Sequence, residues 1–311
     1  MDDDLDEVAV RCRSDDAGVR RVAMMDCAEL PGAEALLVAG LQDTDSAVRE
    51  AAARALDEHQ GTDVAVALIG ALTDPDPAVR QAAAQTLADK KEPGATQLLI
   101  ERAGDADPFV AAASLRTLRE MIVHEALPTA LRSLGSPAPE VRIEAIAVLG
   151  WLKADSALPA LMKVGADPEP TVRRAVMSVM VMARPGGPGA STLLAGLRDP
   201  DWQVREEAAA TIAKTRMPEA TGTLIEALED PVWQVRVKAA NALGRLRAHA
   251  AIDALGQALG HEMSNLRKEA AASLGEIADP ACLPWLAHGA TDPDPDVRRV
   301  VKWAEGRCSA G

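Results

Sequence analysis

Two His-Glu dipeptides stand out in the sequence, because imidazole and carboxylate groups together can ligate a metal ion. They are His124-Glu125 and His261-Glu262, and the other histidines are His59, His249 and His288. None of the five forms an HxxxH or similar ligand pair, and they are spread over different parts of the chain. We therefore predict no metal and no cofactor, with each histidine hydrogen-bonded or exposed to solvent.

Residues for nucleophilic or acid-base catalysis do not form a recognisable motif. There is no nucleophile elbow, catalytic Cys-His pairing or paired-carboxylate motif, although abundant carboxylates leave open a pair formed only in the folded chain. The segment Gly186 to Gly189 resembles a phosphate loop but lacks the Lys-Ser/Thr ending and a preceding strand. We predict no catalytic residues and interpret this segment as a loop with one inserted residue.

The four cysteines lie near the two ends of the chain and form no CxxC pair: Cys12, Cys27, Cys282 and Cys308. Such cysteines are typical of buried free thiols in a reducing compartment. A redox or metal-binding pair is the alternative.

The composition limits the possible partners. A formal net charge of -14 should repel nucleic acids and anionic membranes, because both are bound through Lys and Arg. The amino terminus has no basic and apolar signal sequence, and no apolar run reaches the roughly 18 residues of a membrane span. We predict a cytoplasmic protein that binds neither nucleic acid nor membrane.

A dipeptide of Val and Arg recurs along the whole chain. Neighbouring copies are 29 to 32 residues apart, and most are 31 apart. This constant period indicates one supersecondary unit stacked on itself. The copies are Val19-Arg20, Val48-Arg49, Val79-Arg80, Val110-Ala111, Val141-Arg142, Val172-Arg173, Val204-Arg205, Val235-Arg236, Leu266-Arg267 and Val297-Arg298.

Each unit predicts two helices. Asp76 suits an N-cap and Pro77 the first helical position, which begins the second helix of the unit, helix B. Val79, Ala83 and Leu87 then form an apolar stripe at helical spacing. An amphipathic segment before each turn, such as 64 to 72, 220 to 228 or 252 to 259, predicts the first helix, helix A, with about three turns.

The pattern D-P-x-V-R-x-x-A-A-x-x-L after a helix A resembles the short HEAT-like repeat first described in phycobilisome lyases, over residues 5–307. The resemblance implies an all-α fold, a right-handed α-solenoid superhelix of about ten two-helix repeats. We predict a single domain over 1–311, with repeat boundaries about every 31 residues. Residues 1–13 would be an acidic N-terminal cap, and 296–311 a C-terminal capping helix.

Two families with similar repeats have activities connected with enzymes, and the residues of this sequence bear on each. Deoxyhypusine hydroxylase holds two irons with His-Glu pairs just after the V-R dipeptide, and the matching positions here lack histidine: Arg21-Val22, Glu50-Ala51, Gln81-Ala82, Ile143-Glu144, Glu206-Glu207 and Lys268-Glu269. That activity is therefore not transferred. A subunit of a bilin lyase is the alternative function, supported by the repeat type alone.

The repeated arginine needs an acidic partner, because a cation in the first turn of a helix opposes the helix dipole. Seven turns carry Asp five residues before the Val position. We predict an Asp-Arg ladder between successive turns, and a row of ligand-binding arginines is the alternative. The predicted ladder contains Asp74, Arg80, Asp105, Asp199, Arg205, Asp230 and Arg236, with further aspartates at Asp43, Asp167 and Asp292.

We expect binding residues at exposed positions of helix B where the residue type differs from the other repeats. The resemblance implies that B helices line the concave side, and a large apolar residue among exposed positions marks an interaction site. The predicted partner-binding patch contains Ile143, Ala147, Trp151, Arg174, Ser178, Met182 and Lys214. For Trp151 and Met182, packing against the stack or the glycine-rich loop stays an equal alternative. Trp202 and Trp233, at the turns, either pack or contact a partner at the rim.

Together these features predict a non-catalytic scaffold, adaptor or assembly factor. Its partner would be a protein or peptide, and the acidic turns favour a basic one. The sequence does not define the oligomeric state.

Overall fold

The structure is a computed structural model that describes residues 2–309. Over that range it is all-helical, with α-helices, short 3-10 helices and no strand. The α-helices are α1 (Asp2–Arg11), α2 (Ala17–Cys27), α3 (Glu34–Gly40), α4 (Ser46–Ala55), α5 (Thr62–Ala71), α6 (Pro77–Ala88), α7 (Thr96–Arg102), α8 (Pro108–Glu120), α9 (Leu127–Ser133), α10 (Pro139–Trp151), α11 (Leu158–Val164), α12 (Pro170–Val179), α13 (Ala190–Gly196), α14 (Trp202–Thr215), α15 (Thr221–Ala227), α16 (Trp233–Leu246), α17 (Ile252–Ala258), α18 (Ser264–Ile277), α19 (Leu283–Gly289) and α20 (Pro295–Ser309).

Most A helices follow directly on a 3-10 turn, and two further turns end a B helix. The 3-10 helices are η1 (Leu56–Glu58), η2 (Pro93–Ala95), η3 (His124–Ala126), η4 (Asp155–Ala157), η5 (Met180–Met182), η6 (Pro218–Ala220), η7 (His249–Ala251) and η8 (Pro280–Cys282).

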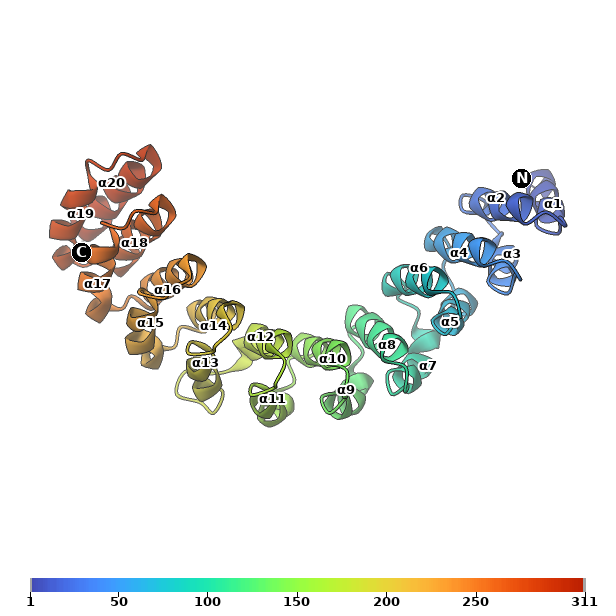
Figure 1. Ribbon diagram of the computed structural model, residues 1–311, viewed down its shortest axis with the longest axis horizontal. Coiled ribbons are helices and arrows are strands. Elements are labelled where there is room, and N and C mark those ends of the chain that lie inside the picture. Colours follow the sequence, from blue (N-terminus) through green and yellow to red (C-terminus); the bar gives the residue numbers. More distant parts are fainter. Residues whose placement is uncertain (1, 310–311) are drawn as a thin grey trace. The chain divides into compact units, whose positions relative to one another are not determined.

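The chain divides into two compact units, residues 1–154 and residues 155–311. In each unit the even-numbered helices are the B helices and pack on one another, α2 on α4 in the first unit and α14 on α16 in the second. The odd-numbered A helices pack on the B helix of their own repeat, as α5 does on α6. Each unit is thus a two-layered stack of helix pairs (Figure 1). The predicted all-helical repeat architecture is confirmed, while the right-handed superhelix and the single domain over 1–311 stay predictions.

Helix B begins as the sequence predicts. The Asp76 carboxylate accepts a hydrogen bond from the backbone N–H of Ala78, and Pro77 is the first helical residue. Behind this cap, Val79, Ala83 and Leu87 are fully buried. Burial of this stripe against neighbouring helices stabilises the helix far more than its intrinsic propensity does. Asp107 caps α8 in the same way, whereas the side chain of Glu169 makes no cap bond at α12.

The helix predicted at 64 to 72 is α5, whose ten residues make about three turns as expected, but the other two predicted A helices are shorter. The segment predicted at 220 to 228 is a 3-10 turn followed by the seven-residue α15, and the one at 252 to 259 is the seven-residue α17. Two turns suffice because the helix is held by packing on helix B.

The terminal helices lie where caps are predicted. α1 falls within the acidic segment 1–13 and buries Val8 against α2. α20 begins one residue before the predicted capping helix and buries Val297, Val301 and Ala304. Residues 310 and 311 of that prediction lie outside the described residues.

Candidate binding surface on the B helices

The C-terminal end of helix B carries a charge pattern that changes along the chain. Ten residues after each Val position, the residue is acidic in the first four repeats, apolar in the next two and basic in the two after those. A carboxylate at a helix C-terminus opposes the helix dipole, so helix stability does not explain the four acids. From the first repeat to the tenth, these residues are Glu29, Glu58, Asp89, Glu120, Trp151, Met182, Lys214, Arg245, Glu276 and Arg307.

The net charges of the two units follow the same trend, from acidic in the first unit to nearly neutral in the second. Residues 1–154 contain 27 acidic and 15 basic residues, a net charge of -12, whereas residues 155–311 contain 20 and 18, a net charge of -2. Nearly all of the excess negative charge of the chain therefore belongs to the first unit.

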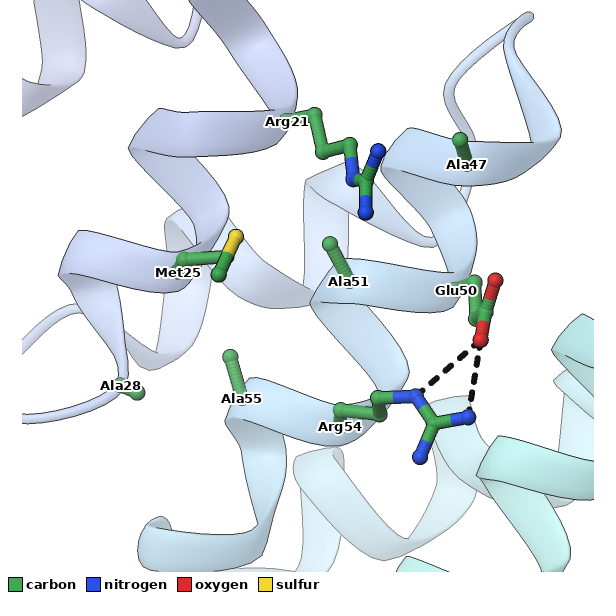
Figure 2. Close-up of a pocket in the computed structure, with 8 residues that line it drawn as sticks. All are labelled: Arg21, Met25, Ala28, Ala47, Glu50, Ala51, Arg54 and Ala55. Carbon is green, nitrogen blue, oxygen red and sulfur yellow. Dashed lines mark hydrogen bonds and ion pairs between the residues drawn. The ribbon is translucent and has the colours of Figure 1, made fainter. Parts of the chain in front are cut away.

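In the first unit, α2 and α4 enclose a shallow depression of about 320 Å³ (Figure 2). Alanines of α4 and Ala28, which directly follows α2, line it, and the Met25 side chain, 59% exposed, lies at its edge. Arg54 donates from Nε and Nη2 to one oxygen of Glu50, at 3.1 and 2.8 Å, while Arg21 extends from α2 toward α4. An apolar floor flanked by cations suits an apolar side chain next to a carboxylate. The sequence reasoning did not select this site, although Arg21 and Met25 occupy the stripe positions that it used elsewhere.

The first-unit part of the predicted patch lies on α10. Ile143 and Ala147 are half-buried, and Trp151, the last residue of the helix, is 58% exposed. Its indole therefore has most of its surface in solvent.

The second-unit part of the predicted patch is more polar. Arg174 is exposed, with its Nε 3.9 Å from a carboxylate oxygen of Glu207, and the Ser178 hydroxyl donates to the carbonyl of Ala175. Met182 is half-buried in η5, and Lys214 is exposed near the end of α14.

The two turn tryptophans begin B helices of the second unit. Trp202 is the first residue of α14 and is half-buried, and Trp233 is the first residue of α16 and is just exposed. A packing role therefore fits the half-buried indole of Trp202 better than the exposed indole of Trp233.

Arginine and aspartate side chains link neighbouring repeats within each unit. In each pair, Nε and Nη2 of the arginine bond both carboxylate oxygens of an aspartate in the next turn, as in Arg173 and Asp199 at 2.7 Å each. The Asp199 carboxylate also accepts the N–H of Asp201. Bidentate charged hydrogen bonds of this kind fix geometry as well as adding stability. Five pairs of this kind are Arg20 with Asp43, Arg49 with Asp74, Arg173 with Asp199, Arg205 with Asp230, and Arg267 with Asp292.

The arginines of the repeated dipeptide also form a second set of bonds, which the sequence does not predict. Nη1 donates to the carbonyl oxygens five and six residues earlier, in the turn before its own helix, as Arg205 does to Pro200 and Asp199. These bonds compensate for a cation in the first turn. They occur at Arg20, Arg49, Arg142, Arg173, Arg205, Arg267 and Arg298.

Three predicted members of the ladder have other partners. Arg80 lies 3.5 Å from a carboxylate oxygen of Asp107 and 5.5 Å from the ring centroid of Phe109, while Asp105 is bonded by Arg102 of its own repeat. Arg236 meets the imidazole of His261 at 2.9 Å, because histidine replaces aspartate at that turn. The predicted links through Asp105 and from Arg236 to an aspartate are therefore wrong.

The ladder changes the electrostatics of the turns. Burial raises the pKa of Asp199, but hydrogen bonds from Arg173 and a backbone N–H outweigh it, and the pKa lies below its ordinary 3.8. The Asp199 side chain is only 11% exposed. It is neutralised by its arginine and does not offer a free negative charge to a basic partner.

A basic groove, which the sequence reasoning did not find, lies in the second unit between α14, α16 and α18. It has a volume of about 430 Å³. We call it the basic groove after the four cations that line it, Lys214, Arg216, Lys238 and Arg245.

Four of the five histidines are hydrogen-bonded within the protein, and the fifth, His124, is exposed. His59 is buried, with Nδ1 3.2 Å from Glu34 and Nε2 3.1 Å from the carbonyl of Cys27. Within residues 2–309, no group of His, Cys, Asp or Glu is arranged to hold a metal ion. Each helix in that range is also too short or too polar to cross a lipid bilayer.

All four cysteines have free thiols, with Cys12 half-buried and the others buried. Burial, followed by the neighbouring Cys12, raises the pKa of Cys27 to about 12, and burial, followed by the neighbouring Cys308, raises the pKa of Cys282 to about 12. Both thiols are therefore protonated and unreactive at neutral pH.

Comparison with solved structures shows the same fold in other solenoids. An engineered protein aligns with a TM-score of 0.56 and 22% identity, over 99% of each chain. A chain from the complex of Kap95p with RanGDP aligns with a TM-score of 0.66 and 15% identity, and importin beta with 0.59 and 14%. Each alignment covers 99% of this chain but only 50% and 55% of those two, so the chain spans about half their length.

Sequence comparison points to one family. The curated proteins include no significant match. The profile described as HEAT repeats matches residues 5–88, 34–119, 96–180, 190–264 and 252–307. These matches extend over most of the sequence and coincide with the stacked helix pairs, so the chain belongs to the HEAT repeat family.

Proposed function

We propose that this protein is a non-catalytic scaffold, adaptor or assembly factor of the cytoplasm that holds a partner protein or peptide on its B helices. The observation that carries the proposal is the exposure of Met25 and Trp151 on the B-helix layer of the first unit. Both side chains are more than half exposed at positions where the repeat pattern places polar residues. Exposed Trp and Met side chains concentrate binding energy at protein interfaces.

A basic partner segment fits the first unit better than the second. The turn aspartates of the ladder are neutralised, but Glu29, Glu58 and Asp89 are exposed at the C-terminal ends of successive B helices. With a net charge of -12, the unit would attract a basic segment and speed its association. Kap95p, a fold relative, is named in a complex with RanGDP, a protein partner.

Affinity capture from the native host tests the proposal. The wild-type chain and a Met25→Ala, Trp151→Ala double variant are used as baits, and a partner recovered stoichiometrically by the wild type should be lost from the variant. Val66→Ala is the matched control, because Val66 is an exposed apolar residue of α5 in the helix-A layer. Equal recovery with all three baits would reject this surface, and iron or a bound chromophore in the purified protein would reject the non-catalytic function.

A further inference from the structure

The basic groove of the second unit contains positive charge that the fold does not use. In residues 2–309, none of Lys214, Arg216, Lys238 and Arg245 forms an ion pair or side-chain hydrogen bond, and all four are exposed. Elsewhere in the unit, arginines such as Arg205 and Arg267 are bonded on every side. The groove cations are therefore available to a ligand.

Helix stability explains only part of this charge. Lys214 and Arg245 lie in the last turns of α14 and α16, where a cation favours the helix dipole. Lys238 lies in the first half of α16, away from that end. Arg216 has a φ of 53°, a left-handed conformation in which glycine is preferred and a long side chain gains nothing.

Two of the cations lie at equivalent positions of neighbouring repeats, an arrangement that suits an extended chain. Lys214 and Arg245 occupy the same position in successive repeats, on helices that pack together. Packed helices lie about 8 to 10 Å apart, a distance that an extended peptide covers in about three residues. The groove is also lined by Ala210, Ala213 and Val237, whose small apolar surfaces allow a peptide backbone to approach.

The rest of the lining favours a peptide over a nucleic acid. Among the described residues, no aromatic side chain lines the groove, whereas single-stranded nucleic acids are bound by stacking on aromatic rings. The groove also contains Glu269, which accepts a hydrogen bond of 2.7 Å from Asn241 and would repel a continuous row of phosphates. Carboxylates that are spaced apart along a peptide can instead lie away from Glu269.

We infer that the second unit binds an acidic peptide segment of a partner protein, with carboxylates about three residues apart, in the basic groove. This deepens the proposed function and rests on it, since it assigns to the second unit a partner of opposite charge from that of the first.

The experiment is a fluorescence polarisation titration of the full chain with a labelled peptide that carries glutamate at every third position. Binding should be tight at low salt and weaken with added salt. A Lys214→Glu, Arg245→Glu variant should raise Kd at least about tenfold, because two attractions become repulsions. The matched control is Lys163→Glu, Arg198→Glu, which makes the same charge change at exposed positions outside the groove. Its Kd should equal that of the wild type.

Several outcomes would overturn the inference. One is an unchanged Kd in the groove variant, and another is an equal loss in both variants, which would indicate attraction by overall charge alone. Oligothymidylate bound as tightly, with the same loss in the groove variant, would assign the groove to nucleic acid. Sedimentation showing self-association that only the groove variant abolishes would make a second copy the occupant. If the peptide fails while Trp151→Ala still loses the captured partner, the proposed function stands without this inference.

Discussion

The guanidinium of Arg205 bonds both carboxylate oxygens of Asp230 in the next repeat, Nε to Oδ2 at 2.6 Å and Nη2 to Oδ1 at 2.9 Å. The third nitrogen, Nη1, bonds two carbonyls of its own turn. The pair is nearly buried, with side-chain exposures of 12% and 8%. Its polar groups are thus almost completely satisfied within the protein.

Asp230→Asn should destabilise the second unit by about 2 to 4 kcal/mol, because it leaves a nearly buried guanidinium without its counter-charge. Urea unfolding followed by circular dichroism measures the loss. Arg198→Ala is the control, since the pair of Arg198 and Glu226 is 59% and 66% exposed and should contribute less than about 1 kcal/mol. Equal effects of the two variants would contradict the structural role of the ladder.

Acid should weaken the stack through the same aspartates. Burial raises the pKa of Asp230 and of Asp74, but arginine and backbone hydrogen bonds outweigh it, so each folded-state pKa lies below the ordinary 3.8. A lowered pKa contributes stability that is present above 3.8 and is lost as the pH falls through the folded-state value. The urea concentration at the unfolding midpoint should therefore decrease as the pH is lowered below about 4. For the Asp230→Asn variant, the urea midpoint should decrease less steeply with falling pH than for the wild type. An identical slope in the two proteins would show that the Asp230 carboxyl does not contribute to this loss of stability.

Trp151→Ala should weaken binding of the captured partner by about 1 to 3 kcal/mol, as expected for an exposed aromatic anchor. Its indole is 58% exposed, so the free energy of unfolding should change much less than for a buried tryptophan. Titration calorimetry and thermal unfolding measure the two effects. Loss of folding without loss of binding would assign the indole to the stack.

Cys27 and Cys282 should resist alkylation in the native protein. Burial, with a neighbouring cysteine in each case, raises the pKa of both to about 12, so the thiolate is scarce at pH 8. Mass spectrometry after brief treatment with iodoacetamide should find both unmodified, and treatment in urea should modify all four cysteines. Rapid native modification of Cys282 would instead support a redox role.

Ala278→Gly should stabilise the second unit by about 0.5 to 1 kcal/mol, since Ala278 follows α18 with a φ of 56° and alanine is strained there. Ala272→Gly, within α18, is the control and should cost about 1 kcal/mol. Thermal unfolding compares them, and the same sign for both would show that the left-handed position is unstrained.

The sequence predicts the repeats well because each needs the same residues for the same physical reason. Val79, Ala83 and Leu87 must be buried, and Asp76 must begin a helix. Side-chain partners are harder, because they depend on the neighbouring repeat. In the sequence, His261 at an aspartate position already indicates that Arg236 lacks a carboxylate partner. No feature of the sequence around Asp105, however, shows that this residue pairs with Arg102 and not with Arg80.

The basic groove was missed for a related reason. Within one repeat, Lys214 is an ordinary exposed cation at a helix end. Only α14 and α16 together place it beside Lys238 and Arg245. Comparing the same position across all repeats reveals the change from acidic to basic residues, and that comparison needs only the sequence.

Because each arginine of the ladder reaches only one repeat ahead, the stack has a natural unit of length. Removing residues 199–229, one period of 31, would bring Asp230 to the place where Asp199 receives Arg173. Such a chain would have the same junction at the point of excision. Proteins of this design can therefore grow or shrink by duplication or deletion of whole periods in the gene, whereas a loss of half a period would leave unmatched charges at the seam.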